Sequence, residues 1–251
     1  MLEPRRYLIR NRSGIMGTPI KEKERDCHAA GRPATCDVCE ARGSSICADL
    51  GPREFAQVEK TMARRHVAKN RALMVEGEPN ESLYVIVEGC FRLSKMLEDG
   101  RRQVTGFLFK GDFAGVRSTE TSAYTAEALD DGLVCFFPHR FLDEIAIDAP
   151  GVKDRLIQRG QTEYHKAQDH IVLLGKKTAE ERVVSFIAMI NDRIGFDDEN
   201  GGRCVPLPMP RQDIADYLGL RLETLSRTLT SLRDAGRLVD VKRHSVTIPA
   251  S

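Results

Sequence analysis

Short runs of apolar residues dominate the chain from Val67 to Pro138 and predict β-structure. Two runs, Ser82–Val87 and Gln103–Leu108, are rich in β-branched and aromatic residues, which is typical of strands. Asp99-Gly100 stands between apolar runs and fits a hairpin turn. Because many short strands separated by regular glycine turns suit packed antiparallel sheets, we expect a sandwich or jelly roll here.

The apolar pattern takes a helical period on both sides of this region. Upstream it predicts a short helix from Pro52 to Arg65. Downstream it predicts a long helix from Pro150 to Leu174, with Asp148 as its cap and Gly175 at its end. A narrow stripe runs along this long helix: Ile157, Gly160, Tyr164, Ala167, Ile171 and Leu174. Such a stripe predicts a coiled-coil seam between two copies of the chain, with packing against its own domain as the alternative.

Two shorter helices with a tight turn between them are predicted near the C-terminus. After a helix that starts at the Thr178/Glu181 capping box, Pro210 begins the first of the pair and Leu222–Ala235 forms the second. Gly219 can adopt the left-handed conformation that the turn between them needs. This spacing is typical of a helix-turn-helix.

The outward face of the second helix carries side chains suited to DNA bases: Arg221, Glu223, Thr224, Ser226 and Arg227. Arginine can donate to both acceptors of guanine, glutamate can accept from cytosine, and hydroxyl groups reach bases or phosphates. Glu223 and Arg227 are four residues apart, so an ion pair within the helix is the alternative. Arg237–Val241 and Ser245–Ile248 then predict a hairpin whose basic tip is suited to phosphate.

Charge and composition narrow the class of protein. The 38 basic and 37 acidic residues give a net charge of +1, which argues neither for nor against nucleic acid. The sequence has no apolar run long enough for a membrane span and no secretory signal at its start, so we expect a cytoplasmic protein. It also lacks the glycine-rich nucleotide motifs and the His-Glu-x-x-His motif, and its histidines are scattered, so we do not expect an enzyme.

The seven cysteines are the main candidates for further chemistry, since a reducing cytosol disfavours disulfides. Cys36 and Cys39 are separated by two residues, and Cys47 follows after seven more. Cys135 lies far away, at the end of a predicted strand, and could fix that loop to the domain. Four thiolates suit an iron–sulfur cluster or structural zinc, and the single close pair argues only weakly against zinc.

Three further cysteines are weaker candidates. Cys27 lies next to His28 and is a possible substitute ligand, although the segment from Met1 to Cys47 has no regular period and is expected to be poorly structured. Cys90 and Cys204 are expected to be small core or surface residues.

The order of these elements resembles the CRP/FNR family of regulators. Leu222–Arg227 matches the Glu-x-x-Ser-Arg recognition helix of the FNR branch, and Lys176–Arg182 is also similar. The resemblance covers roughly Cys36 to the C-terminus and implies an α+β fold. It divides the chain into a cysteine-rich segment (1–47), a cyclic-nucleotide-binding-like jelly-roll sensor domain (48–149), a dimerisation helix (150–175) and a winged helix-turn-helix (176–251).

The resemblance also implies a function. A homodimer would bind double-stranded DNA at a palindrome of the TTGAT-N4-ATCAA type, through Glu223, Ser226 and Arg227, and would act with RNA polymerase. Four cysteines would hold one oxygen-labile 4Fe-4S cluster: Cys36, Cys39, Cys47 and Cys135. Oxygen would then weaken the dimer, which implies a transcription activator of anaerobic metabolism.

One departure from the family, one rejected ligand and one alternative function complete this expectation. The seam carries no acidic residue to oppose pairing, which predicts a dimer that forms readily. A cyclic nucleotide is not expected, because Thr121 stands where the phosphate-binding arginine of related pockets would lie. The alternative is a regulator of the same family without an iron–sulfur cluster, resembling the FixK branch and controlled by zinc, thiol oxidation or a partner protein.

Overall fold

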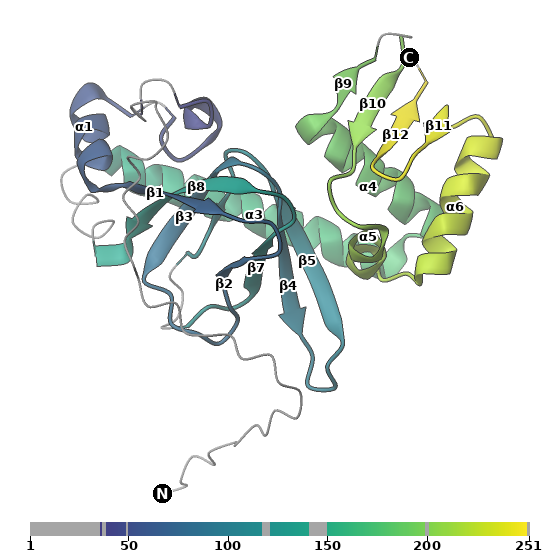
Figure 1. Cartoon of the computed structure of the whole chain (residues 1–251), viewed down its shortest axis with the longest axis horizontal. Helices are drawn as coiled ribbons and strands as arrows, with labels where there is room; N and C mark the ends of the chain where they lie inside the picture. The colour runs from purple at the N-terminus through teal and green to yellow at the C-terminus, as the bar shows by residue number, and fades with distance from the viewer. Residues whose placement is uncertain are drawn as a thin grey trace, which may run out of the picture. The chain divides into compact units, whose positions relative to one another are not determined.

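The computed structural model describes residues 36, 39–48, 50–116, 121–140, 150–198 and 201–249. Within these ranges a β-domain is followed by two helices and a C-terminal domain in which two further helices accompany a small sheet (Figure 1). Cys27 and Asp148, named above as a substitute ligand and a helix cap, lie outside the described residues.

Two four-stranded antiparallel sheets form the β-domain (Figure 1). The first has the order β1 (Ala63–Val67), β8 (Gly132–Pro138), β3 (Ser82–Glu88) and β6 (Phe113–Ala114). The second has the order β2 (Ala72–Met74), β7 (Thr125–Ala128), β4 (Phe91–Met96) and β5 (Arg102–Leu108). The predicted jelly-roll class is confirmed, and so is the hairpin at Gly100, whose φ of +83° suits glycine.

Strand β3 is buried on both of its faces. Ile86 points into the core between the two sheets, whereas Leu83, Val85 and Val87 belong to a second apolar cluster on the other face. The register pairs Val85 with Cys135 of β8, so Cys135 belongs to this second face. Cys135 therefore lies in the middle of its strand, not at the end as predicted.

The segment before β1 is better ordered than its sequence suggested. Helix α1 spans Pro52–Thr61, so the prediction of a helix to Arg65 is wrong over its last residues, which belong to β1. The preceding turn η2 (Arg42–Ser44) lies in a stretch where Ala41, Ile46 and Leu50 are buried. The expectation of poor structure up to Cys47 is thus wrong for the described part, because apolar contacts with α1 and β8 fix a stretch without regular period.

Two consecutive helices follow the β-domain. Helix α3 spans Pro150–Lys176 and continues through Gly175, slightly beyond the predicted end. Helix α4 spans Ala179–Ile194, and its predicted capping box is confirmed, since Thr178 Oγ1 accepts from the Glu181 backbone and the Glu181 carboxylate accepts in return. Arg182 on α4 donates to the backbone carbonyls of Leu174 and Leu218 at 2.7 and 2.9 Å.

The C-terminal domain is a winged helix-turn-helix. Helix α5 (Arg211–Leu218) ends at Gly219, whose φ of +60° allows the sharp turn into α6 (Leu222–Asp234). A four-stranded sheet packs beside them in the order β11 (Asp240–Val241), β12 (Ser245–Ile248), β10 (Arg203–Pro206) and β9 (Phe196–Asp197). The predicted strand Arg237–Val241 is confirmed only for its last two residues.

None of the helices in the described ranges combines the length and the apolar character that crossing a bilayer requires.

Candidate functional site

Helix α6 separates a buried apolar face from an exposed polar one. Leu225, Leu229 and Leu232 are buried in the core of the C-terminal domain. Since these positions recur at spacings of four and three, the intervening residues project to solvent. Glu223, Ser226 and Arg227 are exposed, as is Arg221 at the start of the helix, and Thr224 is half-buried. The structure thus gathers the predicted base-reading residues on one side of one helix.

These reading side chains are not engaged within the chain. In the part of the chain that the structure describes, no hydrogen bond or ion pair involves the side chains of Glu223, Ser226 or Arg227, so the alternative ion pair between Glu223 and Arg227 is not formed. Two backbone carbonyls of the helix accept from hydroxyl groups one turn on, Thr224 from Thr228 and Ser226 from Thr230. The polar face is therefore free for an external partner.

A basic hairpin tip lies between the last two strands. Lys242, Arg243 and His244 are all exposed, which fits both a tip that contacts phosphate and an ordinary solvated turn. Arg211 at the start of α5 donates to the carbonyl of Lys242 at 2.5 Å, which ties the tip to the helix-turn-helix. Phosphate contacts of this kind position a protein on DNA without reading its sequence.

The second candidate site is the cysteine cluster, which we define as Cys36, Cys39, Cys47 and Cys135. Cys36 and Cys135 are buried members of one apolar cluster, and Cys39 and Cys47 pack against it half-buried. The charges of the three other thiols raise the pKa of Cys135, so all three lie within electrostatic reach of it. The structure therefore brings together a loop and a strand that are about 90 residues apart in sequence, as the spacing from Cys47 to Cys135 shows.

Burial raises the pKa of three of these thiols, those of Cys36, Cys47 and Cys135. Burial raises the pKa of Cys135 to about 12 and that of Cys36 to about 11, with the charge of Glu59 adding to the effect on Cys36. The charge of Arg64, which pairs with Cys135 in the β1–β8 register, acts in the opposite direction on both thiols. Glu59 and Arg64 were not predicted, because nothing local in the sequence relates them to the cysteines.

The cysteine cluster is not arranged as a site for a single metal ion. Among the described residues, no three His, Cys, Asp or Glu side chains stand in a group that could hold one metal ion. A single zinc ion binds all of its sulfur ligands at about 2.3 Å and therefore holds the thiolates close together. An iron–sulfur cluster instead binds each thiolate through a different iron.

The remaining cysteines lie elsewhere. Cys90 is buried in the turn between β3 and β4, where burial raises its pKa, and Cys204 is half-buried on β10. Neither appears among the charges that act on the cysteine cluster. Their interpretation as packing residues agrees with these positions.

The predicted seam on α3 is open to solvent for most of its length. Tyr164 and Ile171 are 63% and 70% exposed, and Ile157, Gly160 and Ala167 are exposed as well. Leu174 differs, because it is half-buried against the core of the C-terminal domain. A contiguous apolar stripe on a long helix is suited to a second copy of the chain, and Leu174 lies at the point where it meets the same chain's own core.

The carboxylate of Asp112 is held by contacts within the chain. The carboxylate of Asp112 accepts from the Phe109 backbone at 2.9 Å and forms an ion pair with Arg193 of α4. Ser122 is buried beside Thr121. The expectation that no cyclic nucleotide binds remains a prediction.

Comparisons with known proteins follow the division seen in the structure. Residues 64–148 match the family model of a cyclic nucleotide-binding domain, and residues 181–250 match the Crp-like helix-turn-helix domain. The chain is 36% identical to the nitrogen fixation regulation protein FixK of Bradyrhizobium diazoefficiens, over 81% of this chain and 85% of that protein. It is 37% identical to the transcriptional activatory protein AadR of Rhodopseudomonas palustris, over 86% of this chain and 96% of that protein.

Solved structures give the same result. The structure of FixK2 from Bradyrhizobium japonicum superposes with a TM-score of 0.68 at 36% identity, covering 74% of this chain and 92% of that one. With 36% of the aligned residues identical, the two proteins are similar in sequence as well as in fold. These relatives are named as regulators of transcription or of nitrogen fixation, not as enzymes.

Proposed function

The chain belongs to the CRP/FNR family of DNA-binding transcription regulators, and from this premise we propose that it responds to oxygen through a 4Fe-4S cluster. The convergence of Cys36, Cys39 and Cys47 on Cys135 is the observation that carries the proposal. No other part of the described chain gathers four thiols.

The residues present fit such a group. Four cysteines supply a complete thiolate set, and the surrounding apolar side chains of α1, β3 and β8 keep water away. Arg64 favours the ionised form of Cys36 and Cys135, which counters the cost of burying thiolates. When bound, the cluster would supply an oxygen-labile centre that ties the loop to β8.

Contacts between the cysteine loop and α3 support a route from the cysteine cluster to the predicted dimerisation helix. Leu156 of α3 packs against the apolar cluster that contains Cys36 and Cys135. Arg159 of α3 donates to the backbone carbonyl of Ser44 in the same loop. Both residues flank Ile157 and Gly160 of the predicted seam, so a loop released from β8 would remove support from this part of α3.

The DNA-reading part of the proposal rests on α6. A dimer paired along α3 would present two recognition helices to a palindrome of the TTGAT-N4-ATCAA type. Glu223, Ser226 and Arg227 would contact base edges, and the tip at Lys242 and Arg243 would contact phosphate. RNA polymerase is the proposed partner in activation.

A second candidate is a regulator of this family without iron, controlled by zinc, thiol oxidation or a partner protein. Packing favours this candidate, because Cys36 and Cys135 are buried and the Sγ of Cys36 lies 3.8 Å from the Sδ of Met62, as expected of a small core thiol.

Anaerobic purification separates the two candidates. We expect about four irons and four sulfides per chain, and a brown colour that bleaches in air. Cys135→Ser should lose the iron, whereas Cys204→Ser, a half-buried cysteine away from the cluster, should keep it. A colourless wild-type protein with zinc or without metal would overturn the oxygen-sensing proposal and leave a DNA-binding regulator with a different signal.

A further inference from the structure

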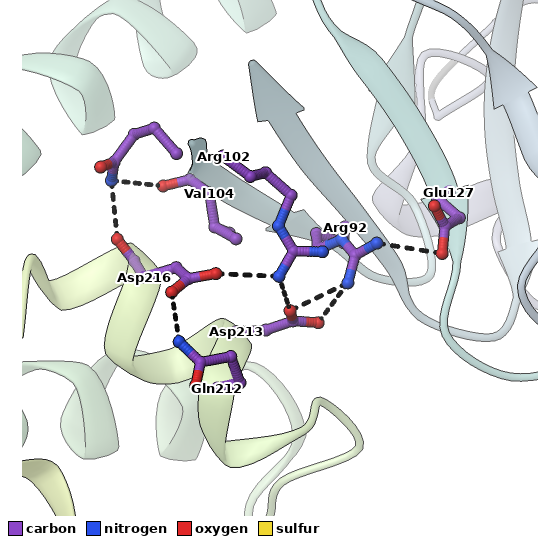
Figure 2. Close-up of polar contacts among 8 residues, drawn as sticks. Arg92, Arg102, Val104, Glu127, Gln212, Asp213 and Asp216 are labelled. Carbon is purple, nitrogen blue, oxygen red and sulfur yellow. Dashed lines mark hydrogen bonds and ion pairs between the residues drawn. The ribbon is translucent and has the colours of Figure 1, made fainter. Parts of the chain in front are cut away.

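Two arginines of the β-domain reach two aspartates of the helix-turn-helix (Figure 2). Arg92 Nη1 on β4 donates to both carboxylate oxygens of Asp213 on α5, at 2.9 and 2.7 Å. Arg102 Nη2 on β5 donates to Asp213 at 2.5 Å and to Asp216 at 2.8 Å. We call these four residues the interdomain ion-pair network.

Arg92 and Asp213 of this network are buried, and Arg102 and Asp216 are half-buried. Asp213 is only 2% exposed, which is rare for a carboxylate unless it is fully paired. Arg92 also pairs with Glu127 of β7 at 3.0 Å, which orients its guanidinium. Gln103 Nε2 donates to the backbone carbonyl of Asp216 at 2.7 Å, so α5 is held by its backbone as well. Such geometry specifies one arrangement of the two domains, because charges removed from water must keep their partners.

Apolar side chains of β5 and its neighbourhood also join the two domains. Phe107 of β5 packs against Phe186 and Tyr217, with ring centroids 6.1 and 5.6 Å apart. Val104 and Phe109 of the β-domain belong to the same buried cluster as the core of the C-terminal domain. The contact between β5 and α5 is thus a continuous core with a polar centre, not a loose surface encounter.

The interdomain ion-pair network does not cover the exposed side of α6 that carries Glu223, Ser226 and Arg227, which we call the reading face. Asp213 and Asp216 face β4 and β5, whereas Glu223, Ser226 and Arg227 of α6 remain exposed and unengaged within the described chain. The interdomain contact therefore does not inhibit by covering α6. Two recognition helices of a dimer must, however, lie about one DNA turn apart, roughly 34 Å, to enter successive major grooves. A domain that swings on its linker meets this spacing only part of the time.

We propose that Arg92, Arg102, Asp213 and Asp216 are positioning residues for DNA reading, which hold each recognition helix at the orientation that a two-half-site operator requires. The inference rests on the proposed reading of a palindrome by a dimer. It predicts that the network matters for the second half-site and not for the first.

The test compares the Asp213→Asn/Asp216→Asn variant with wild type on two DNA duplexes, one with both half-sites and one with a single half-site. We expect affinity for the full site to fall about tenfold, as when the competent orientation is populated one-tenth of the time, and half-site affinity to change less than about twofold. Arg102→Gln is a milder second variant. Arg101→Gln and Asp197→Asn remove the same charges at exposed positions and should bind like wild type.

A readout without DNA accompanies this comparison. Trypsin should cut the variant about tenfold faster at Lys176–Lys177, between α3 and α4, because the released domain exposes the connection more often. Unchanged cleavage, equal losses on both duplexes, or tighter full-site binding would each overturn the inference. A wild-type protein that binds full and half sites equally, while cleavage still accelerates in the variant, would instead refute the proposed palindrome reading.

Discussion

The reading face of α6 and the cysteine cluster are built in opposite ways. The reading residues come from one helix, lie in solvent and make no contacts within the described chain that a ligand would have to break. The cysteines come from a loop and a distant strand, are buried or half-buried, and pack within or against one apolar cluster. The first region is ready for its partner when folded, whereas the second is part of the core that stabilises the domain.

This difference teaches which substitutions separate function from folding. A change on an exposed, unpaired face alters binding and leaves stability within about 0.5 kcal/mol. A change among the buried thiols alters the core before any metal is considered. Four predictions test this contrast, beginning with the largest expected effect.

Arg227→Ala should weaken full-site DNA binding by about 2–6 kcal/mol, since each bidentate base contact contributes about 1–3 kcal/mol and a dimer makes two. Fluorescence anisotropy with labelled palindromic DNA measures the loss, and thermal unfolding should be unchanged. Arg233→Ala is the matched control, because Arg233 lies at the other end of α6 and pairs with Asp234. Equal losses in both variants would indicate general charge attraction instead of base reading.

Ile171→Asp should convert the chain to a monomer. Burial of two Ile171 side chains in a dimer is worth about 3 kcal/mol or more, and two carboxylates would repel one another. Analytical ultracentrifugation should show the cluster-free wild type as a dimer at micromolar concentration, since the seam carries no acidic residue. Val172→Asp alters an exposed neighbour outside the stripe and should remain dimeric. A monomeric wild type would contradict the expected ease of dimerisation.

Cys135→Ser should destabilise the metal-free protein by about 1–3 kcal/mol, because a hydroxyl replaces a buried thiol in an apolar environment. Urea unfolding measures this change, and binding to a single half-site should stay unaltered. The contrast with the reading face would fail if the variant unfolded like wild type but lost half-site binding.

Tyr217→Phe should flatten the alkaline pH dependence of stability. Burial, with the charge of Asp169 in addition, raises the pKa of Tyr217 to about 12. Between about pH 10 and 12 the folded chain keeps a proton that the unfolded chain loses, so the free energy of unfolding falls as pH rises. Across this pH range the free energy of unfolding of the variant should fall by on the order of 2 kcal/mol less than that of wild type. Tyr164→Phe, at an exposed tyrosine, should behave like wild type in the same urea series.

Sequence patterns predicted the helix-turn-helix well because its signals are local. Gly219, the buried leucines of α6 and the polar positions between them lie within a few turns of one another. The Thr178 capping box and the Gly100 hairpin are equally local, and both are confirmed. The structural role of a residue can be predicted from the sequence where that role depends on residues nearby in the chain.

Contacts between distant segments were not predictable in this way. The order of the loop before α1 depends on packing against β8, and strand pairing with β8 ends α1 before Arg65. Asp213 resembles any acidic residue in a first helical turn, and only the folded chain places it against Arg92, 121 residues away. The four cysteines were grouped by family resemblance, and whether they bind a cluster remains a prediction.

Arg182 gives the connection between α3 and the helix-turn-helix a mechanical property. Its guanidinium binds carbonyls at the end of α3, in the following turn and at the end of α5. While the interdomain ion-pair network keeps α5 in place, these three hydrogen bonds from one planar group stiffen the short connection. A twist of α3 about its own axis would therefore be transmitted to α5 as rotation, with little lost to bending.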